Sequence, residues 1–167
     1  MNAHTIATPA AGLPATPLRL HIGAEQTVIA GRGGHESAPP VALPIGSATV
    51  ARRFKHSPPS AAEIENAIML VEDELFRIHR ANVKESTLST TDASIRALAG
   101  IAGVAAQPRL TLARESVEQL FNRLAAIAQG RPPSQDALPA TAEFCATLLI
   151  LRELMQHLDF ASIDVES

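Results

Sequence analysis

The spacing of apolar residues changes along this chain from a period of two to a period of three to four. In segments 18–22 and 41–45, apolar residues alternate with other residues, a pattern typical of strands with one buried face. Segment 27–29, Thr-Val-Ile, is a further short stretch of β-type residues. A turn at residues 23–25 separates segments 18–22 and 27–29, and a Gly-rich turn at residues 31–34 follows the latter. Three strands before any helix predict an antiparallel meander at the start of the fold.

The clearest helix signal is the segment that begins at Ser60. Ser60 and Glu63 form a capping box directly after two prolines, so a helix is expected to begin there. Its predicted core stripe is Ile64, Ile68, Val71, Leu75 and Ile78. The acidic run 72–74 could suggest a metal site, but successive helical residues point in different directions. A solvated helix face is the simpler interpretation.

The rest of the chain predicts a mixture of helices and short strands. Residues 86–89 are compatible with a strand, Thr91 or its neighbour could cap a helix ending near Gly103, and Thr111 could cap another. The predicted core stripe of that third helix is Val117, Leu120, Phe121, Leu124 and Ile127. A last helix is expected from residues 138–139, burying Phe144, Leu148, Leu151, Met155 and Leu158, before a strand at 163–165. These elements predict a single α/β or α+β domain over residues 18–167, after a flexible Pro/Ala/Thr-rich tail at residues 1–17.

Composition argues against two classes of partner. The chain has a formal net charge of −3 and no Trp or Tyr, so it lacks both the positive field and most of the stacking residues that nucleic acids require. No stretch approaches the ~20 apolar residues of a membrane span. The single Cys145 lies in an apolar run and is interpreted as core filler, not a disulfide partner or a reactive thiol. A cytoplasmic protein without nucleic-acid or membrane partners is expected.

Four segments are similar to sequence motifs of a known protein family, and they occur along the chain in the same order as in that family. Residues 21–29, HIGAEQTVI, match "DIGGGSTEL"; residues 42–54, ALPIGSATVARRF, match "SLPLGxVRLTERF" and precede the proline-led helix start PPSAAEI at 58–64. Residues 90–99, TTDASIRALA, match "GxGGTxxALA", and residues 134–144, SQDALPATAEF, match "RADxLPAGxxIL". The chain therefore resembles the second domain of the exopolyphosphatase / guanosine pentaphosphate phosphatase family. The resemblance implies a ribonuclease-H-like (actin-like ATPase domain) mixed sheet, with the antiparallel meander first and helices packed on the sheet.

The resemblance also implies where phosphate would bind and shows that both turns are altered. The family's two glycine-rich turns correspond here to Gly23, Ala24, Glu25 and Gln26, and to Thr90, Thr91, Asp92, Ala93 and Ser94. Each turn now carries a carboxylate. Two like unit charges ~4 Å apart repel by about 1 kcal/mol in water and about 4 kcal/mol at an effective dielectric of 20. We therefore expect degenerate phosphate loops that disfavour anions.

Three functions remain open on these observations. The family's catalytic glutamate belongs to its first domain, for which residues 1–167 show no counterpart, so we expect no catalytic residue and a protein that acts through protein contacts, as a homodimer or with a partner. The alternative is a phosphoric-anhydride hydrolase, or a binder of polyphosphate or nucleotide phosphate, that completes its cleft with a second chain. A third hypothesis is a divalent cation held by His21, Glu25 and Asp92. Solvated loop residues are the simpler interpretation of that third set.

Overall fold

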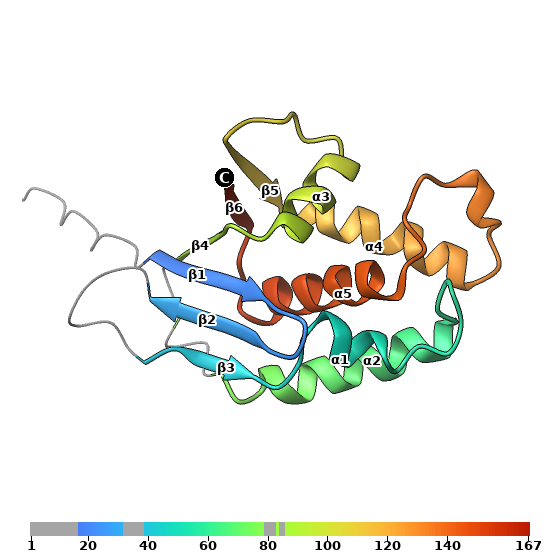
Figure 1. The fold of residues 1–167 in the computed structure, drawn as a ribbon, viewed down its shortest axis with the longest axis horizontal. Coiled ribbons are helices and arrows are strands. Elements are labelled where there is room, and N and C mark those ends of the chain that lie inside the picture. The colour runs from blue at the N-terminus through green and yellow to red at the C-terminus, as the bar shows by residue number, and fades with distance from the viewer. Residues whose placement is uncertain (1–16, 32–38, 79–82, 84–85) are drawn as a thin grey trace, which may run out of the picture.

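The computed structural model describes residues 17–31, 39–78, 83 and 86–167. Within these residues, six strands form one sheet in the order β3-β2-β1-β4-β6-β5 (Figure 1). They are β1 (Pro17–Ile22), β2 (Thr27–Gly31), β3 (Val41–Leu43), β4 (Thr87–Thr90), β5 (Arg109–Ala113) and β6 (Ser162–Glu166). The strands β1, β2 and β3 pair antiparallel, β1, β4 and β6 run parallel, and β5 is antiparallel to β6. The predicted mixed sheet with a leading meander is confirmed.

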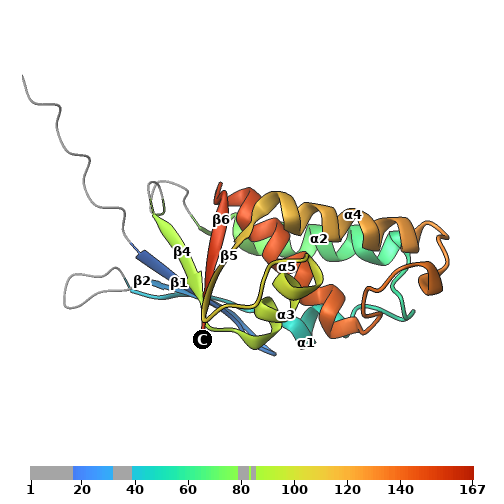
Figure 2. The ribbon, with the colours of Figure 1, turned by 90° about the horizontal axis from the view of Figure 1, so that it is seen from above.

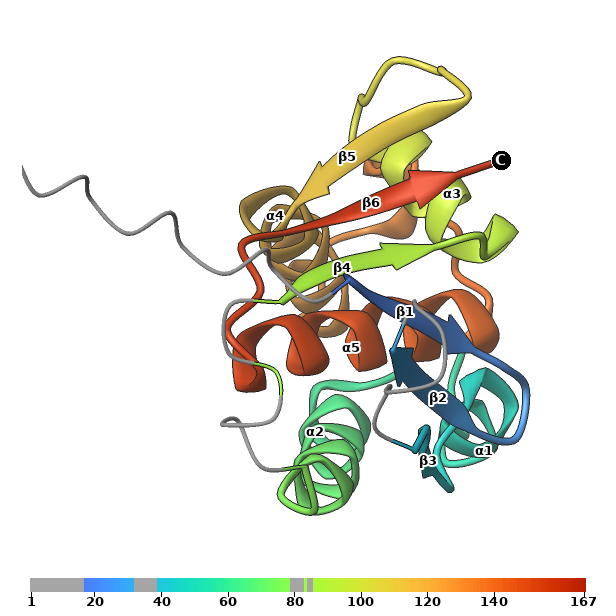
Figure 3. The ribbon, with the colours of Figure 1, turned by 90° about the vertical axis from the view of Figure 1, so that its left-hand side faces the viewer.

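The helices form a layer against this sheet. They are α1 (Ser47–Ala51), α2 (Ala61–Leu75), α3 (Ala93–Ile101), α4 (Arg114–Ala128), the 3₁₀ turn η2 (Pro133–Gln135) and α5 (Ala142–His157). Helices α2, α4 and α5 lie on the same side of the sheet (Figures 2 and 3). Helix α5 is the centre of the layer, because α1, α2 and α4 all pack on it. No helix among the described residues is long and apolar enough to cross a membrane.

The sheet buries one face and exposes the other. Along β1 the side chains of Leu18, Leu20 and Ile22 are buried, whereas Arg19 and His21 are exposed. Strand β5 alternates in the same way. Antiparallel strands commonly show this division between a core face and a solvated face. The period-two pattern in the sequence therefore identifies correctly which face of β1 meets the helices.

Two predicted helix starts are wrong. Thr111 lies in the middle of β5 and does not cap α4, which begins at Arg114; β5 itself was not predicted. Pairing with β6 over residues 109–113 holds Thr111 in the sheet. The last helix begins at Ala142, where the hydroxyl of Thr141 accepts a hydrogen bond from the Phe144 N–H at 3.3 Å. Residues 138–139 belong to the loop before it.

The structure also differs from the prediction in the ends of two strands and in the burial of one core residue. The third strand ends at Leu43, although Ile45 beyond it is buried, and β1 already includes Pro17, which the prediction placed in the tail. The predicted tail up to residue 16 and the turn residues 32–34 lie outside the described residues. On α2, Ile68 is only partly buried, while the other four residues of its predicted stripe are buried. Cys145 is fully buried, and burial raises the pKa of its thiol to about 11. The interpretation of Cys145 as core filler is confirmed.

The capping box at the start of α2 is present as predicted. The Glu63 carboxylate accepts the Ser60 N–H at 2.8 Å, and the Ser60 hydroxyl accepts the Glu63 N–H at 3.4 Å. The same carboxylate also accepts the Lys55 N–H at 2.5 Å. These hydrogen bonds, from the Ser60 N–H first and the Lys55 N–H second, lower the pKa of Glu63 to about 2.

This lowered pKa predicts an acid-dependent stability. The carboxylate stabilises the fold above its unfolded-state pKa of about 4.3, and this contribution is lost as the pH falls through that value toward 2. We expect Glu63→Gln to lower the melting temperature at pH 7 and to flatten its decline in acid. Thermal unfolding followed by circular dichroism between pH 7 and pH 2 measures both effects. The exposed Glu65→Gln on the same helix is the control, and an unchanged acid profile in Glu63→Gln would contradict the assignment.

Candidate functional site at the ends of β1 and β4

The carboxyl ends of β1 and β4 meet at the point where the chain connections diverge. The two strands are parallel neighbours, but β1 continues to β2 on one side, while β4 continues through α3 toward β5 and β6 on the other. In open α/β sheets, such a switch point forms the crevice in which ligands bind. Both altered turns, residues 23–26 and 90–94, follow these strand ends. The second turn contacts the last residues of β1, since the side chain of Asp92 reaches His21 and the backbone of Ile22.

Asp92 fills the space between the two strand ends. One oxygen of its carboxylate lies 2.7 Å from Nδ1 of His21, and the other accepts the Ile22 N–H at 2.7 Å. The side chain is only 8% exposed, whereas that of His21 is 63% exposed. The Asp92 N–H donates to the hydroxyl of the buried Thr90 at 3.0 Å. Asp92 therefore ties β4 to the last residues of β1.

The same contacts explain an unusual start of α3. Asp92 occupies the N-cap position, yet its side chain makes no capping hydrogen bond to α3. Both of its oxygens are directed to β1 instead. The next residues of the turn, Ala93 and Ser94, are exposed, as is Thr91. The turn is thus organised around the Asp92 carboxylate, whereas a phosphate-binding turn presents backbone N–H groups to its anion.

The first turn presents carbonyl groups to α1. The turn is closed by the Gly23 N–H, which donates to the Gln26 carbonyl at 2.9 Å. The Gly23 carbonyl accepts the Ser47 N–H at 2.9 Å. The Ala24 carbonyl accepts from the next two residues of α1, Ala48 at 2.9 Å and Thr49 at 3.2 Å. These contacts satisfy N–H groups that a helix start otherwise leaves without partners, so they are not available to an anion.

Glu25 points to a different partner from the one predicted. Its carboxylate accepts two hydrogen bonds from the Arg52 guanidinium, at 3.1 and 2.9 Å, and this contact lowers the pKa of Glu25. Both side chains are mostly exposed. Of the three residues in the cation hypothesis, the structure brings together only His21 and Asp92. Within the described ranges, no three His, Cys, Asp or Glu side chains form a group suited to a metal ion.

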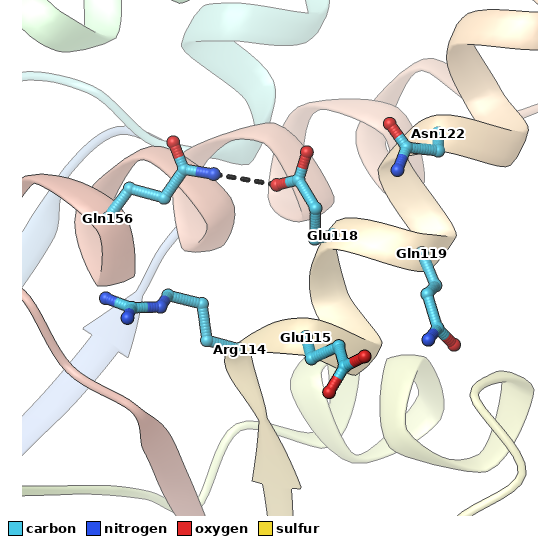
Figure 4. Close-up of a pocket in the computed structure, with 6 residues that line it drawn as sticks. All are labelled: Arg114, Glu115, Glu118, Gln119, Asn122 and Gln156. Atoms are coloured by element: carbon cyan, nitrogen blue, oxygen red, sulfur yellow. Dashed lines mark hydrogen bonds between the residues drawn. The ribbon is translucent and has the colours of Figure 1, made fainter.

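A hollow lies away from these strand ends, where α4 begins beside α5. It has a volume of about 400 Å³ and polar walls (Figure 4). Glu118 of α4 accepts a hydrogen bond from Gln156 of α5 across it at 2.7 Å. The Arg114 guanidinium is paired with Asp159 at 2.9 Å. The sequence carried no signal for this hollow, because polar residues on one side of a helix are the ordinary mark of a solvated face.

Comparison with known proteins adds one clear result. No protein-family model and no curated protein sequence matches this chain. Among solved structures, the type II variant of the Aquifex aeolicus Ppx/GppA phosphatase aligns with a TM-score of 0.74 and 16% identity, over 93% of this chain and 54% of its own. The fold is that of Ppx/GppA phosphatases. A Cytophaga hutchinsonii exopolyphosphatase aligns with a TM-score of 0.70 at 16% identity, over 92% of this chain and 54% of its own.

The Ppx/GppA fold confirms the architecture implied by the sequence resemblance. An exopolyphosphatase-like protein also aligns, with a TM-score of 0.67 and 13% identity, over 96% of this chain and 58% of its own. The chain therefore spans about half the length of these structures. Structural similarity at such low sequence identity establishes the fold but not the function, which depends on the residues of the site.

Proposed function

We propose that this Ppx/GppA-like domain is a non-catalytic module that acts through contacts with other proteins. The observation that carries the proposal is the Asp92 carboxylate between the ends of β1 and β4. A phosphate bound there would compete with this carboxylate for the Ile22 N–H. At ~4 Å the two anions would also repel by about 1 to 4 kcal/mol per pair of charges, depending on the dielectric.

The contacts of the first turn support the same conclusion. The carbonyls of Gly23 and Ala24 point toward α1 and take up its first N–H groups. Phosphate recognition by a turn requires backbone N–H groups that point toward the anion. Glu25 adds a second carboxylate at this edge, paired with Arg52. The edge is therefore better suited to protein contacts than to a polyanion, and a second copy or a protein partner is the occupant we propose for it.

We expect the purified chain to hydrolyse neither polyphosphate, guanosine pentaphosphate nor p-nitrophenyl phosphate above the buffer rate, with or without magnesium. Released phosphate is the measurement, and phosphate titration followed on the Ile22 amide by NMR gives a second readout. Asp92→Asn is the matched variant, since it removes the charge and keeps the shape. Turnover by the wild-type chain that Asp92→Asn abolishes would contradict the proposal.

A second candidate function is a phosphatase completed by another chain. The observation that favours it is the length of the match, because this chain spans about half of each enzyme structure reported above. A second chain would have to supply the remainder of the cleft. Sedimentation at micromolar concentration, followed by the same hydrolysis assay on each separated species, distinguishes the two candidates. Activity confined to a dimer or a mixed complex would favour the second.

A further inference from the structure

A groove runs between α2 and α4 on the side of the helical layer away from the strand-end site. Both helices pack on α5, but they touch each other only sparsely. The groove has a volume of about 160 Å³. Its lining is mostly apolar and consists of Ala61, Ile64, Glu65, Ile68, Phe121, Ala125, Ala128 and Gln129. We call it the α2–α4 groove.

Apolar surface continues from the α2–α4 groove along α2. Met69 is 61% exposed and Phe76 is 72% exposed. Their spacing of seven residues places both on one side of the helix, next to the partly buried Ile68. The Phe76 ring also contacts the His157 ring edge-on, with centroids 5.2 Å apart. Exposed apolar residues that share one side of a helix mark interaction sites more often than single ones do.

One end of the groove is acidic. Glu153 of α5 is only 4% exposed and is paired with Arg152. Burial raises the pKa of Glu153; Arg152 opposes this effect, and the nearby charges of Glu72 on α2 and Glu118 on α4 add to it. Arg152 also binds Glu118 at 2.7 Å and lies over the ring of Phe121, 4.1 Å from its centroid. Two carboxylates, those of Glu118 and Glu153, thus bind the one guanidinium beside Phe121, and the charge of Glu72 acts on Glu153 from α2.

We propose that the α2–α4 groove binds an amphipathic helix of a partner protein, with apolar side chains in the groove and a Lys or Arg at its acidic end. This inference rests on the proposed role as a binding module and names its partner class. Helices α2 and α4 both pack on α5 and leave a groove between them. An amphipathic helix binds in a groove of this kind through apolar side chains at positions i, i+3, i+4 and i+7. A cation at the acidic end would balance the excess of carboxylates around Glu153.

A second copy of the chain fits the groove poorly. The exposed sides of α2 and α4 carry acidic residues, including Glu65, Glu72 and Glu115. The arginines of α4 are already paired, Arg114 with Asp159 and Arg123 with Asp136. Arg52 follows α1, which has only five residues. Arg96 of α3 already donates to the carbonyls of Gln107 and Pro108, and Arg152 of α5 is paired with Glu118 and Glu153. Within the described part of the chain, no helix therefore offers an arginine-bearing apolar face of the kind that the groove requires.

The test is a selection from a displayed library of random 20-residue amphipathic helices, with the full chain as bait. We expect enriched peptides to carry apolar residues at helical spacing and Lys or Arg near one end. Ile68→Asp in the groove should weaken their binding by about tenfold or more. Leu70→Asp is the matched control, because Leu70 is also partly buried on α2 but lines a different hollow, with Arg52, Arg53 and Lys55. It should bind as the wild type does.

Charge reversal tests the acidic end separately. Glu72→Lys should weaken the selected peptides, and replacing their terminal Lys or Arg by Glu should restore binding, whereas Asp73→Lys on another side of α2 should not change it. Circular dichroism confirms that each variant is folded. Failure to enrich peptides, equal binding by Ile68→Asp and Leu70→Asp, or self-association through the groove would overturn the inference. These readouts are independent of hydrolysis, so phosphatase activity would contradict the proposed function without deciding this test.

Discussion

Replacing Leu148 with Ala is expected to lower the free energy of unfolding by about 2–5 kcal/mol. Leu148 is fully buried in the middle of α5, as are Leu149, Ile150 and Leu151 around it. Because α1, α2 and α4 all pack on this helix, a cavity at Leu148 would remove contacts that several elements share. Domains of ordinary stability unfold with only about 5–15 kcal/mol. Urea unfolding should therefore show a much lower midpoint, or no folded state at all.

Ile68→Ala on α2 is the matched comparison for this prediction. Ile68 belongs to the same type of apolar stripe, but it is only partly buried beside the α2–α4 groove. Less of its side chain leaves water on folding, so its truncation should cost clearly less than that of Leu148. A midpoint of Leu148→Ala equal to that of the wild type, or a larger loss in Ile68→Ala, would show that α5 is not the centre of the core.

The parts of the fold predicted correctly are those determined by local pattern. The alternation of Leu18, Leu20 and Ile22 shows which face of β1 is buried, because side chains of a strand point alternately to its two faces. The capping box of Ser60 and Glu63 predicts the first turn of α2, since its hydrogen bonds lie within four residues. Neither inference needs knowledge of the rest of the chain.

The errors arise where distant segments decide the structure. Strand β5 is short, and its pairing partner β6 lies about 50 residues later, so Thr111 resembled a helix cap when read locally. In the loop before α5, Asp136 pairs with Arg123 of α4. The backbone of Leu138 also donates to Asp136 at 3.2 Å. These contacts hold in a loop the residues at which a helix start was expected.

At the candidate site, too, the sequence indicated the residues involved but not their long-range contacts. The resemblance indicated which residues form the two altered turns and that each turn carries a carboxylate, Glu25 in the first and Asp92 in the second. It did not indicate that Asp92 binds His21 and the backbone of Ile22, or that Glu25 turns to Arg52. Side-chain directions at strand ends depend on the register of β1 against β4, which the sequence does not reveal. The carboxylates were thus predicted to repel an anion, but their contacts with His21, Ile22 and Arg52 were not predicted.

A second large loss of stability is expected when Gly46, which precedes α1 and lies against the first turn, is replaced by Ala. A Cβ atom added there would lie 2.4 Å from the Ala24 carbonyl oxygen and 2.5 Å from that of Gly23. The φ angle of −142° is one that any residue adopts, so the conflict is steric and involves backbone atoms that a rotamer change cannot move.

We therefore expect Gly46→Ala to separate the turn from α1 and to break the hydrogen bonds that Ser47 and Ala48 donate to it. Overpacking of about 1–3 kcal/mol and two lost hydrogen bonds of about 0.5–1.5 kcal/mol each suggest a total near 3 kcal/mol or more. Gly100→Ala in α3 is the control, because its added Cβ meets nothing within 4 Å and should stabilise the helix by about 0.5–1 kcal/mol. Urea unfolding of both variants measures the difference. If Gly46→Ala were as stable as the wild type, the turn could not be packed on α1 in this way, and its carbonyls would no longer support the proposed non-catalytic role of this site.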